Sequence, residues 1–259
     1  MLIHPTTNSH ILAFSTTRDC IIDVPVNAPL LMPTHQVHGT KTMVIDTAFL
    51  SLSPLEQALQ LHGVDALCTD IPCICIAVKT ADCIPILLYT DDASVISAVH
   101  AGWKGTLQRI VEHNIDLLTR HYGIQPHQLH AVIGPGISLK SFEVGDEVYE
   151  QFQAAHFPMN QIARKYPSSS RQESSPSLLG KAGARLQTSQ PHDLTTSQPH
   201  AKWHIDLWEA NRLQLLGMGL KDGNIHVAGI DTMTTENFYS ARRMKLCDGR
   251  IINGIMIKE

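Results

Sequence analysis

The sequence predicts a layered domain of α/β or α+β class, with its β-sheet covered by helices. Short apolar runs typical of buried strands alternate along the chain with segments of helical periodicity. The composition is that of an ordinary globular protein, with 43% apolar and 17% charged residues. Because 259 residues can bury a substantial core, we interpret residues 1–259 as a single domain.

Five apolar runs predict the strands of this domain. The first, residues 73–79, follows Pro72, and the second, residues 94–100, ends in a histidine. Each is short and bounded by turn-forming residues, as expected of a buried strand. The remaining strands are predicted at residues 129–134, 224–230 and 251–257.

Apolar residues at helical spacing predict three helices between these strands. They cover residues 107–118, 144–152 and 206–217. In the third helix, Asp206 and Glu209 stand three residues apart, as in a capping box that starts a helix.

One segment, residues 165–202, differs in composition from the rest of the chain. It is rich in Ser, Gln, Pro and Thr, and it repeats the motif Thr-Ser-Gln-Pro-His. Such a composition buries too little apolar area to offset the entropy lost on ordering the chain. We predict a low-complexity surface insertion in the domain.

Charge and hydropathy exclude several classes of protein. The formal net charge is −4, without the basic surplus of a nucleic-acid binder. No run of about 18 apolar residues predicts a membrane span. The first residues lack the basic and apolar segments of a signal peptide, so we expect a cytoplasmic protein with reduced cysteines.

Three short stretches at the ends of predicted strands combine glycines with metal-binding side chains. They contribute His38, Cys83 and His100 in turn. One thiolate and two imidazoles suit zinc, and three protein ligands leave a fourth position for water or substrate. The ion would lower the pKa of bound water and polarise a substrate atom. Spacing alone leaves the alternative of hydrogen-bonded histidines and a buried thiol.

Other side chains near these stretches have candidate roles. Asp82, beside Cys83, is placed to orient a metal ligand. Trp103 either stacks on a substrate ring or covers the sheet. Lys104, Arg18, Arg242 and Arg243 are candidate anion contacts, although a solvated surface role is the better explanation of each when taken alone.

The motifs taken in order resemble the YfiH/YlmD family. This family is also called the laccase-domain or polyphenol oxidase family, and its members have been described as purine nucleoside phosphorylases. The resemblance rests on QVHG, VKTADCIPILL, AVHAGWKGTLQRIV, IGPGISLKSFEVGDEVYEQF, DLWEANRLQL, FYSARR and GRIINGIMI. It runs from about Leu31 to the end of the chain, except for the insertion.

The resemblance implies an α+β fold with layered mixed sheets, and a site that holds zinc, or alternatively copper. By motif position the metal ligands are His38, Cys83 and His100. It also implies phosphorolysis of adenosine, inosine and methylthioadenosine, and deamination of adenosine. The partners are then purine nucleosides and phosphate, with no nucleic acid or membrane, and the protein is a monomer or homodimer.

The resemblance also implies roles for individual residues. The catalytic residues are Cys83, His100 and Asp82. Trp103, Lys104, Arg242 and Arg18 are expected to contact the substrates.

The chain departs from the family pattern at three places. Arg18 is followed by Asp19 and Cys20, without the glycines of the family's usual Thr-Arg-x-Gly-Gly stretch, which puts the role of Arg18 in question. Ser141-Phe142 stands where the family has Cys-Tyr, and Asp231-Thr232 stands where it has Cys-Thr. The three expected ligands are intact.

Three other functions remain as alternatives. A copper-dependent polyphenol oxidase of laccase type requires several copper sites, whereas the motifs offer one His/Cys/His group. A hydrolase with Cys83 as nucleophile and His100 as base, or a metal hydrolase editing cell-wall precursors, would use the same residues. A protein that binds purines or metal without turnover is the non-enzymatic alternative.

Overall fold

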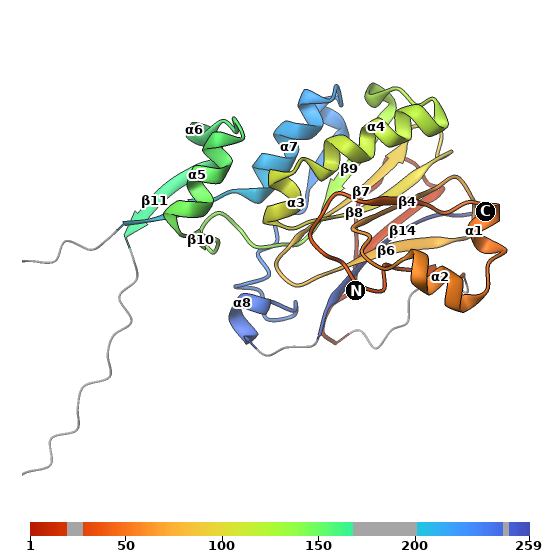
Figure 1. Cartoon of the computed structure of the whole chain (residues 1–259), viewed down its shortest axis with the longest axis horizontal. Helices are drawn as coiled ribbons and strands as arrows, with labels where there is room; N and C mark the ends of the chain where they lie inside the picture. Colours follow the sequence, from red (N-terminus) through yellow and green to blue (C-terminus); the bar gives the residue numbers. More distant parts are fainter. Residues whose placement is uncertain (20–27, 168–200, 246–248) are drawn as a thin grey trace, which may run out of the picture.

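The computed structural model describes residues 1–19, 28–167, 201–245 and 249–259. In these residues the chain forms two large stacked β-sheets, a small third sheet and the helices around them (Figure 1). The large sheets carry the candidate site, so their strands and connections are described first.

The last strand of the chain lies at the centre of the five-stranded sheet. This strand, β14, pairs antiparallel with β2 on one side and with β6 on the other. The short strand β3 extends the sheet, parallel to β6. In sheet order the strands are β1 (Leu2–Ile3), β2 (Ile11–Ser15), β14 (Ile251–Ile257), β6 (Cys75–Thr80) and β3 (Leu30–Leu31).

The six-stranded sheet is built around β7, which pairs antiparallel with β8 and with β9. The strands at the two edges, β13 and β4, run parallel to their neighbours. In sheet order the strands are β13 (Ile225–Val227), β9 (Leu129–Ile133), β7 (Ile84–Thr90), β8 (Ile96–Ala101), β5 (Ala66–Thr69) and β4 (Thr42–Val44).

Helices cover the face of the six-stranded sheet that points away from the five-stranded sheet (Figure 1). This layer consists of α3 (Trp103–Leu107), α4 (Ile110–Tyr122) and α7 (Leu207–Gly217). The shorter helices α1 (Thr47–Leu50), α2 (Pro54–Gln60) and α8 (Ala241–Met244) lie around the sheets, and the 3₁₀ turns are η1 (Pro126–Gln128) and η2 (Asp222–Asn224). None of the helices in the described residues has the length and apolar character that crossing a membrane requires.

The alternation of side chains along β7 explains why three layers form. Ile86 and Leu88 pack toward the helices with Ile115 of α4, while Leu87 packs into the second cluster between the sheets with Ile76 of β6. A strand buried on both faces needs an apolar residue at nearly every position. Each such side chain contributes about 1.5–3 kcal/mol by leaving water.

In the third sheet, the strands at the two ends of the predicted insertion pair with each other. Its order is β10 (Glu143–Val144), β12 (Ala201–Ile205) and β11 (Ala163–Pro167), and α5 (Asp146–Ala154) and α6 (Met159–Ile162) lie beside it (Figure 1). The predicted boundaries were therefore too wide, because residues 165–167 and 201–202 pair as strands. The remainder of the predicted insertion, residues 168–200, lies outside the described residues.

The structure confirms the α+β prediction with layered mixed sheets. The five predicted strands correspond to β6, β8, β9, β13 and β14, and the three predicted helices to α4, α5 and α7, with ends shifted by a few residues. The prediction missed β7, although this strand is central. Pro85 is its second residue, and proline in an apolar run argues against a central strand.

Candidate metal centre

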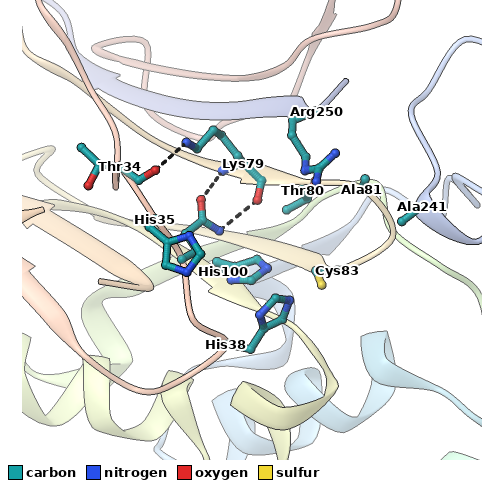
Figure 2. A pocket seen from close by; sticks show the side chains of 11 residues that line it. Thr34, His35, His38, Lys79, Thr80, Ala81, Cys83, His100, Ala241 and Arg250 are labelled. Atoms are coloured by element: carbon teal, nitrogen blue, oxygen red, sulfur yellow. Dashed lines mark hydrogen bonds between the residues drawn. The ribbon is translucent and has the colours of Figure 1, made fainter. Parts of the chain in front are cut away.

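Three side chains from separate parts of the chain converge at one end of the stacked sheets (Figure 2). His38 lies on the β3–β4 loop, Cys83 on the β6–β7 connection, and His100 near the end of β8. Their ligand atoms all lie within 4.8 Å of one another. Among the described residues, this is the one such group of His, Cys, Asp or Glu, and we call it the metal-ligand triad.

The connection between the two large sheets brings the sulfur to the histidines. Strand β6 belongs to the five-stranded sheet and β7 to the six-stranded sheet, so residues 81–83 pass from one to the other. In the β7–β8 register, His100 pairs with Pro85, two positions after Cys83. Short rigid connections of this kind fix a side chain without burying it completely.

Asp65 holds the two histidines in place. Its carboxylate Oδ1 lies 2.9 Å from Nδ1 of His100. The same carboxylate accepts hydrogen bonds from the backbone N–H groups of Val37, His38 and Gly39. Asp65 is fully buried, and it leaves Nε2 as the ring nitrogen of His100 available to a metal.

Charges within the site favour the ligating form of the thiol. Burial by itself raises the pKa of the Cys83 thiol, but hydrogen bonds and charges from His100 and His38 outweigh it and bring the pKa to about 6. Burial by itself lowers the pKa of His100, but Asp65 and Cys83 bring it to about 9. The metal-free pair is therefore a thiolate beside an imidazolium at neutral pH.

Gly102 leaves the space that the ligands occupy. A Cβ atom at this position would lie 2.7 Å from Cδ2 of His38 and 3.0 Å from the sulfur of Cys83. Both distances are shorter than ordinary van der Waals contacts, so a larger residue would displace the ligands. The donor set, one thiolate and two imidazoles, is one that proteins use for zinc and for copper.

The triad opens into a cavity of about 630 Å³, which we call the metal-site cavity. This volume falls in the range of about 300–1,000 Å³ that is typical of small-molecule sites. The lining residues are Thr34, His35, Gln36, His38, Lys79, Thr80, Ala81, Cys83, His100, Ala241 and Arg250. The triad is therefore accessible to a small organic substrate.

The comparisons with known proteins show the family of this chain. A family model described as "Multi-copper polyphenol oxidoreductase laccase" matches residues 21–189 and 179–258. A purine nucleoside phosphorylase of Bacteroides thetaiotaomicron is 40% identical over 223 residues, which cover 86% of this chain and 71% of the relative. The chain belongs to this YfiH/YlmD family.

Two further findings describe the family around this chain. An adenosine deaminase from an unknown prokaryotic organism is 36% identical over 230 residues, covering 88% of this chain and 75% of the relative. The crystal structure of YlmD from Geobacillus stearothermophilus has a TM-score of 0.72 at 22% identity, covering 100% of this chain and 99% of that one. The latter likeness shows the shared fold.

Asp82, predicted to orient a ligand, has its carboxylate bound by two neighbouring segments of the chain. Its carboxylate accepts hydrogen bonds from Oγ1 of Thr232 at 2.7 Å and from the backbone N–H of Arg242 at 2.8 Å. It thus fastens the Cys83 connection to the segment that begins α8. Asp65 supports the histidine side of the triad in a similar way, because its carboxylate contacts both histidine segments.

Two predicted substrate contacts, Trp103 and Lys104, begin α3 and do not line the metal-site cavity. The Trp103 ring packs, partly buried, against the core under α3. The ammonium of Lys104 lies 5.5 Å from the centroid of that ring. Trp103 therefore covers the sheet, which is the alternative that the sequence left open.

The two predicted arginine contacts are likewise not among the residues that line the cavity, although Ala241, next to Arg242, is. The Arg242 guanidinium donates to the carbonyls of Ser141 and Glu143. The Arg18 guanidinium donates to the carbonyl of Glu236 at 3.2 Å. Both cations are thus bound to backbone oxygen atoms and brace loops.

The cavity instead contains cations that sequence reasoning had not singled out, Lys79 and Arg250. Both lie in motifs that carry the family resemblance, VKTADC and GRIINGIMI. The pairing of β6 with β14 brings these motifs together, and this register cannot be read from either motif alone. Asp65 was missed because a single acid before a short strand has no distinguishing pattern.

The chain's two late departures from the family pattern meet in space. Oγ of Ser141 donates to Oδ2 of Asp231 at 2.5 Å, and Oγ of Ser138 donates to the same oxygen at 2.7 Å. Thr232, next to Asp231, is the residue that binds Asp82. The substitutions therefore occur together in a hydrogen-bonded support beneath the Cys83 connection.

Proposed function

We propose that this protein is a zinc-dependent purine nucleoside phosphorylase acting on adenosine, inosine and methylthioadenosine. The observation that carries the proposal is the convergence of His38, Cys83 and His100 beside a cavity of about 630 Å³. The names of its relatives support this choice of substrate, because the relative at 40% identity is a purine nucleoside phosphorylase. Phosphate is then the second substrate.

Zinc bound by the triad would supply Lewis-acid chemistry at the substrate. Zinc fits the site better than an electron-transfer copper, whose His₂Cys set usually adds a weak axial methionine. No methionine lines the metal-site cavity, and the described residues contain no second group of three ligands for a multicopper centre. The copper-dependent polyphenol oxidase therefore remains the less supported alternative.

In phosphorolysis, an oxygen of phosphate forms a bond to C1′ of the ribose while the bond from C1′ to N9 of the purine breaks. The electron pair of the broken bond goes to the base, which takes up a proton. The transition state is electron-poor at the sugar and gains negative charge on the base. Fixed dipoles and charges stabilise such a state because they need no rearrangement during the reaction.

The residues of the chain contribute mainly by fixing positions. Asp65 accepts the Nδ1–H of His100 and the N–H of His38, which sets both rings before substrate arrives. Asp82 fastens the Cys83 connection from the other side. We propose that Cys83 and His100 act in catalysis as metal ligands, with Asp82 as a positioning residue.

Deamination of adenosine is a second activity that the site can support. The relative at 36% identity is an adenosine deaminase. In this reaction, water adds at C6 of the purine and ammonia leaves, which requires an activated water next to the base. Zinc held by the triad would activate water beside the accessible cavity, which supports this second activity.

A product analysis tests both activities. The purified, zinc-loaded protein is incubated with adenosine and phosphate, and the products are separated by chromatography. We expect adenine and ribose 1-phosphate from phosphorolysis, and inosine from deamination. The absence of all three products would contradict the proposed function. Metal analysis of protein expressed without added copper is expected to find about one zinc ion per chain. Finding copper alone would favour the oxidase.

A single variant distinguishes a metal ligand from a covalent nucleophile. We expect Cys83→Ser to lose bound zinc together with activity, because the sulfur is one of three ligands. Irreversible substrate-derived labelling of Cys83 in the zinc-loaded protein would instead favour the cysteine hydrolase.

A further inference from the structure

The lining of the metal-site cavity has a one-sided charge. Its eleven lining residues, all from the described part of the chain, include Lys79 and Arg250 and no aspartate or glutamate. The buried acid of the site, Asp65, lies behind His100 and does not line the cavity. A concave surface with fixed positive charges and no acid attracts anions, and its low-dielectric walls strengthen the attraction.

The sheet register places both cations on the same side of the five-stranded sheet. In the β6–β14 pairing, Lys79 is opposite Ile252 and Thr80 is opposite Ile251. Arg250 directly precedes Ile251, so it occupies the next position on the side that carries Lys79 and Ile252. Figure 2 shows Lys79 and Arg250 along one wall of the cavity, with the triad on the other.

The backbone at Lys79 is firmly held. The side-chain amide of Gln36 accepts from the N–H of Lys79 at 2.8 Å and donates to its carbonyl at 2.9 Å. The ammonium of Lys79 lies 3.4 Å from the carbonyl of Thr34. The Arg250 guanidinium donates to the carbonyl of Gly249 at 2.9 Å. The forked guanidinium of Arg250 suits a phosphate in particular.

We infer that Lys79 and Arg250 form the phosphate-binding wall of this enzyme. The inference rests on the proposed phosphorylase function and specifies where the second substrate binds. Inorganic phosphate lies against β6 and β14, and the nucleoside lies between it and the triad. This arrangement replaces the sequence-based expectation that Lys104 or Arg242 contacts phosphate.

Steady-state kinetics of the zinc-loaded protein test the inference. In Lys79→Gln and Arg250→Gln we expect the KM for phosphate to rise about tenfold or more, because each variant loses a charge-assisted hydrogen bond. The KM for adenosine and the zinc content are expected to stay close to wild type. Lys79→Arg is expected to restore most of the affinity for phosphate.

The matched control is Lys221→Gln, which removes a charge from an exposed residue before η2. It is expected to change neither KM value, so a general loss of positive charge cannot explain the result. Thermal unfolding identifies any variant that is misfolded. Lys79→Gln carries the test if Arg250→Gln fails to fold, because only the ammonium end of Lys79 changes.

The outcomes separate this inference from the proposed function. Phosphorolysis with an unchanged phosphate KM in both glutamine variants would overturn the inference and leave the function intact. If the wild type forms no ribose 1-phosphate, the proposed function fails. Phosphorus NMR titration with inorganic phosphate then tests the wall directly. Phosphate binding that both glutamine variants weaken supports the inference. Phosphate binding that both variants leave unchanged overturns it.

A nucleotide could supply the same phosphate group, and a competition experiment distinguishes the two sources. Adenosine 5′-monophosphate is added to the phosphorolysis assay. We expect weak inhibition, because the wall accepts free phosphate beside a bound nucleoside. Strong inhibition that Lys79→Gln abolishes would show that the wall binds the phosphate of a nucleotide, and it would overturn the assignment to inorganic phosphate.

Discussion

Two buried histidines among the described residues are each bonded to an aspartate, yet only His100 belongs to the metal-ligand triad. His100 contacts Asp65 through Nδ1 at 2.9 Å, and it is 3% exposed. His130 contacts Asp91 through Nε2 at 2.5 Å, and it is 7% exposed. Burial and an acidic partner are thus common to both and do not distinguish them.

The difference lies in the second ring nitrogen. In His130 the remaining nitrogen, Nδ1, lies 3.3 Å from Oγ1 of Thr7, and the ring stacks on Tyr89. Both nitrogens are therefore occupied by structural contacts, Nε2 with Asp91 and Nδ1 with Thr7. In His100 the remaining nitrogen faces the thiol of Cys83, which makes it available as a ligand.

The two aspartates also differ, both in their burial and in the segments that they bind. Asp65 is fully buried and also binds the backbone of the loop that carries His38. The side chain of Asp91 is 57% exposed. An acid that organises two ligand segments at once indicates a built site, whereas one that secures a single ring at the surface indicates a structural contact.

Replacing the two histidines is expected to give the largest contrast. We expect His100→Ala to abolish both zinc binding and activity, because one of three ligands is removed. His130→Ala is expected to keep both and to lose about 1–3 kcal/mol of stability, because Asp91 and Thr7 lose their partner. Metal analysis and denaturant unfolding measure these effects. Loss of zinc in His130→Ala would contradict the purely structural role of His130.

Replacing the two acids tests the orienting role directly. We expect Asp65→Asn to weaken zinc binding about 10- to 100-fold, the usual effect of removing an acid that supports a ligating histidine. Asp91→Asn is the matched control and is expected to leave zinc affinity unchanged. Competition with a zinc chelator measures both affinities. Equal affinities in the two variants would mean that Asp65 contributes packing only.

The layered fold was largely predictable because periodicity is a local property of the sequence. The apolar run of β14 and the helical pattern of α4 identify their elements without knowledge of the rest of the chain. The pairing of strands depends instead on contacts between distant segments. No local pattern places β14, from the end of the chain, between β2 and β6.

The site was predictable only in part for the same reason. The triad was found because His38, Cys83 and His100 lie in motifs that carry the family resemblance. Asp65 acts through contacts with the His38 loop, which precedes it by 26 to 28 positions, and with His100, which follows it by 35 positions. No spacing rule reveals contacts over such separations. Lys104 was favoured for its neighbouring glycines, but it lies in α3 and is not among the residues that line the cavity.

A glycine pair tests whether the space between the ligands matters. In Gly102→Ala the new methyl group meets His38 and Cys83, so we expect zinc affinity to fall about tenfold. Gly217→Ala adds the same methyl group at the end of α7, where no atom lies within 4 Å. It is expected to retain zinc and to be slightly more stable. Competition with a zinc chelator measures the zinc affinity of both variants. An unchanged zinc affinity in Gly102→Ala would show that the His38 loop can move to accommodate the methyl group.

The smallest expected effect concerns the thiolate beside His100, the feature that His130 lacks. A lowered pKa means that Cys83 is deprotonated above about pH 6 and protonated below it. We therefore expect alkylation of Cys83 by iodoacetamide in zinc-free protein to rise about tenfold between pH 5 and 7 and to level off above.

Cys75 is the internal control, because burial raises its pKa to about 12 and it should stay unlabelled through this range. Mass spectrometry of the two peptides follows both thiols in one sample. A Cys83 rate that still climbs steeply at pH 9 would mean that His100 and His38 do not stabilise the thiolate. The contrast with His130 would then rest on geometry alone, since the charge that prepares the sulfur for a metal would be absent.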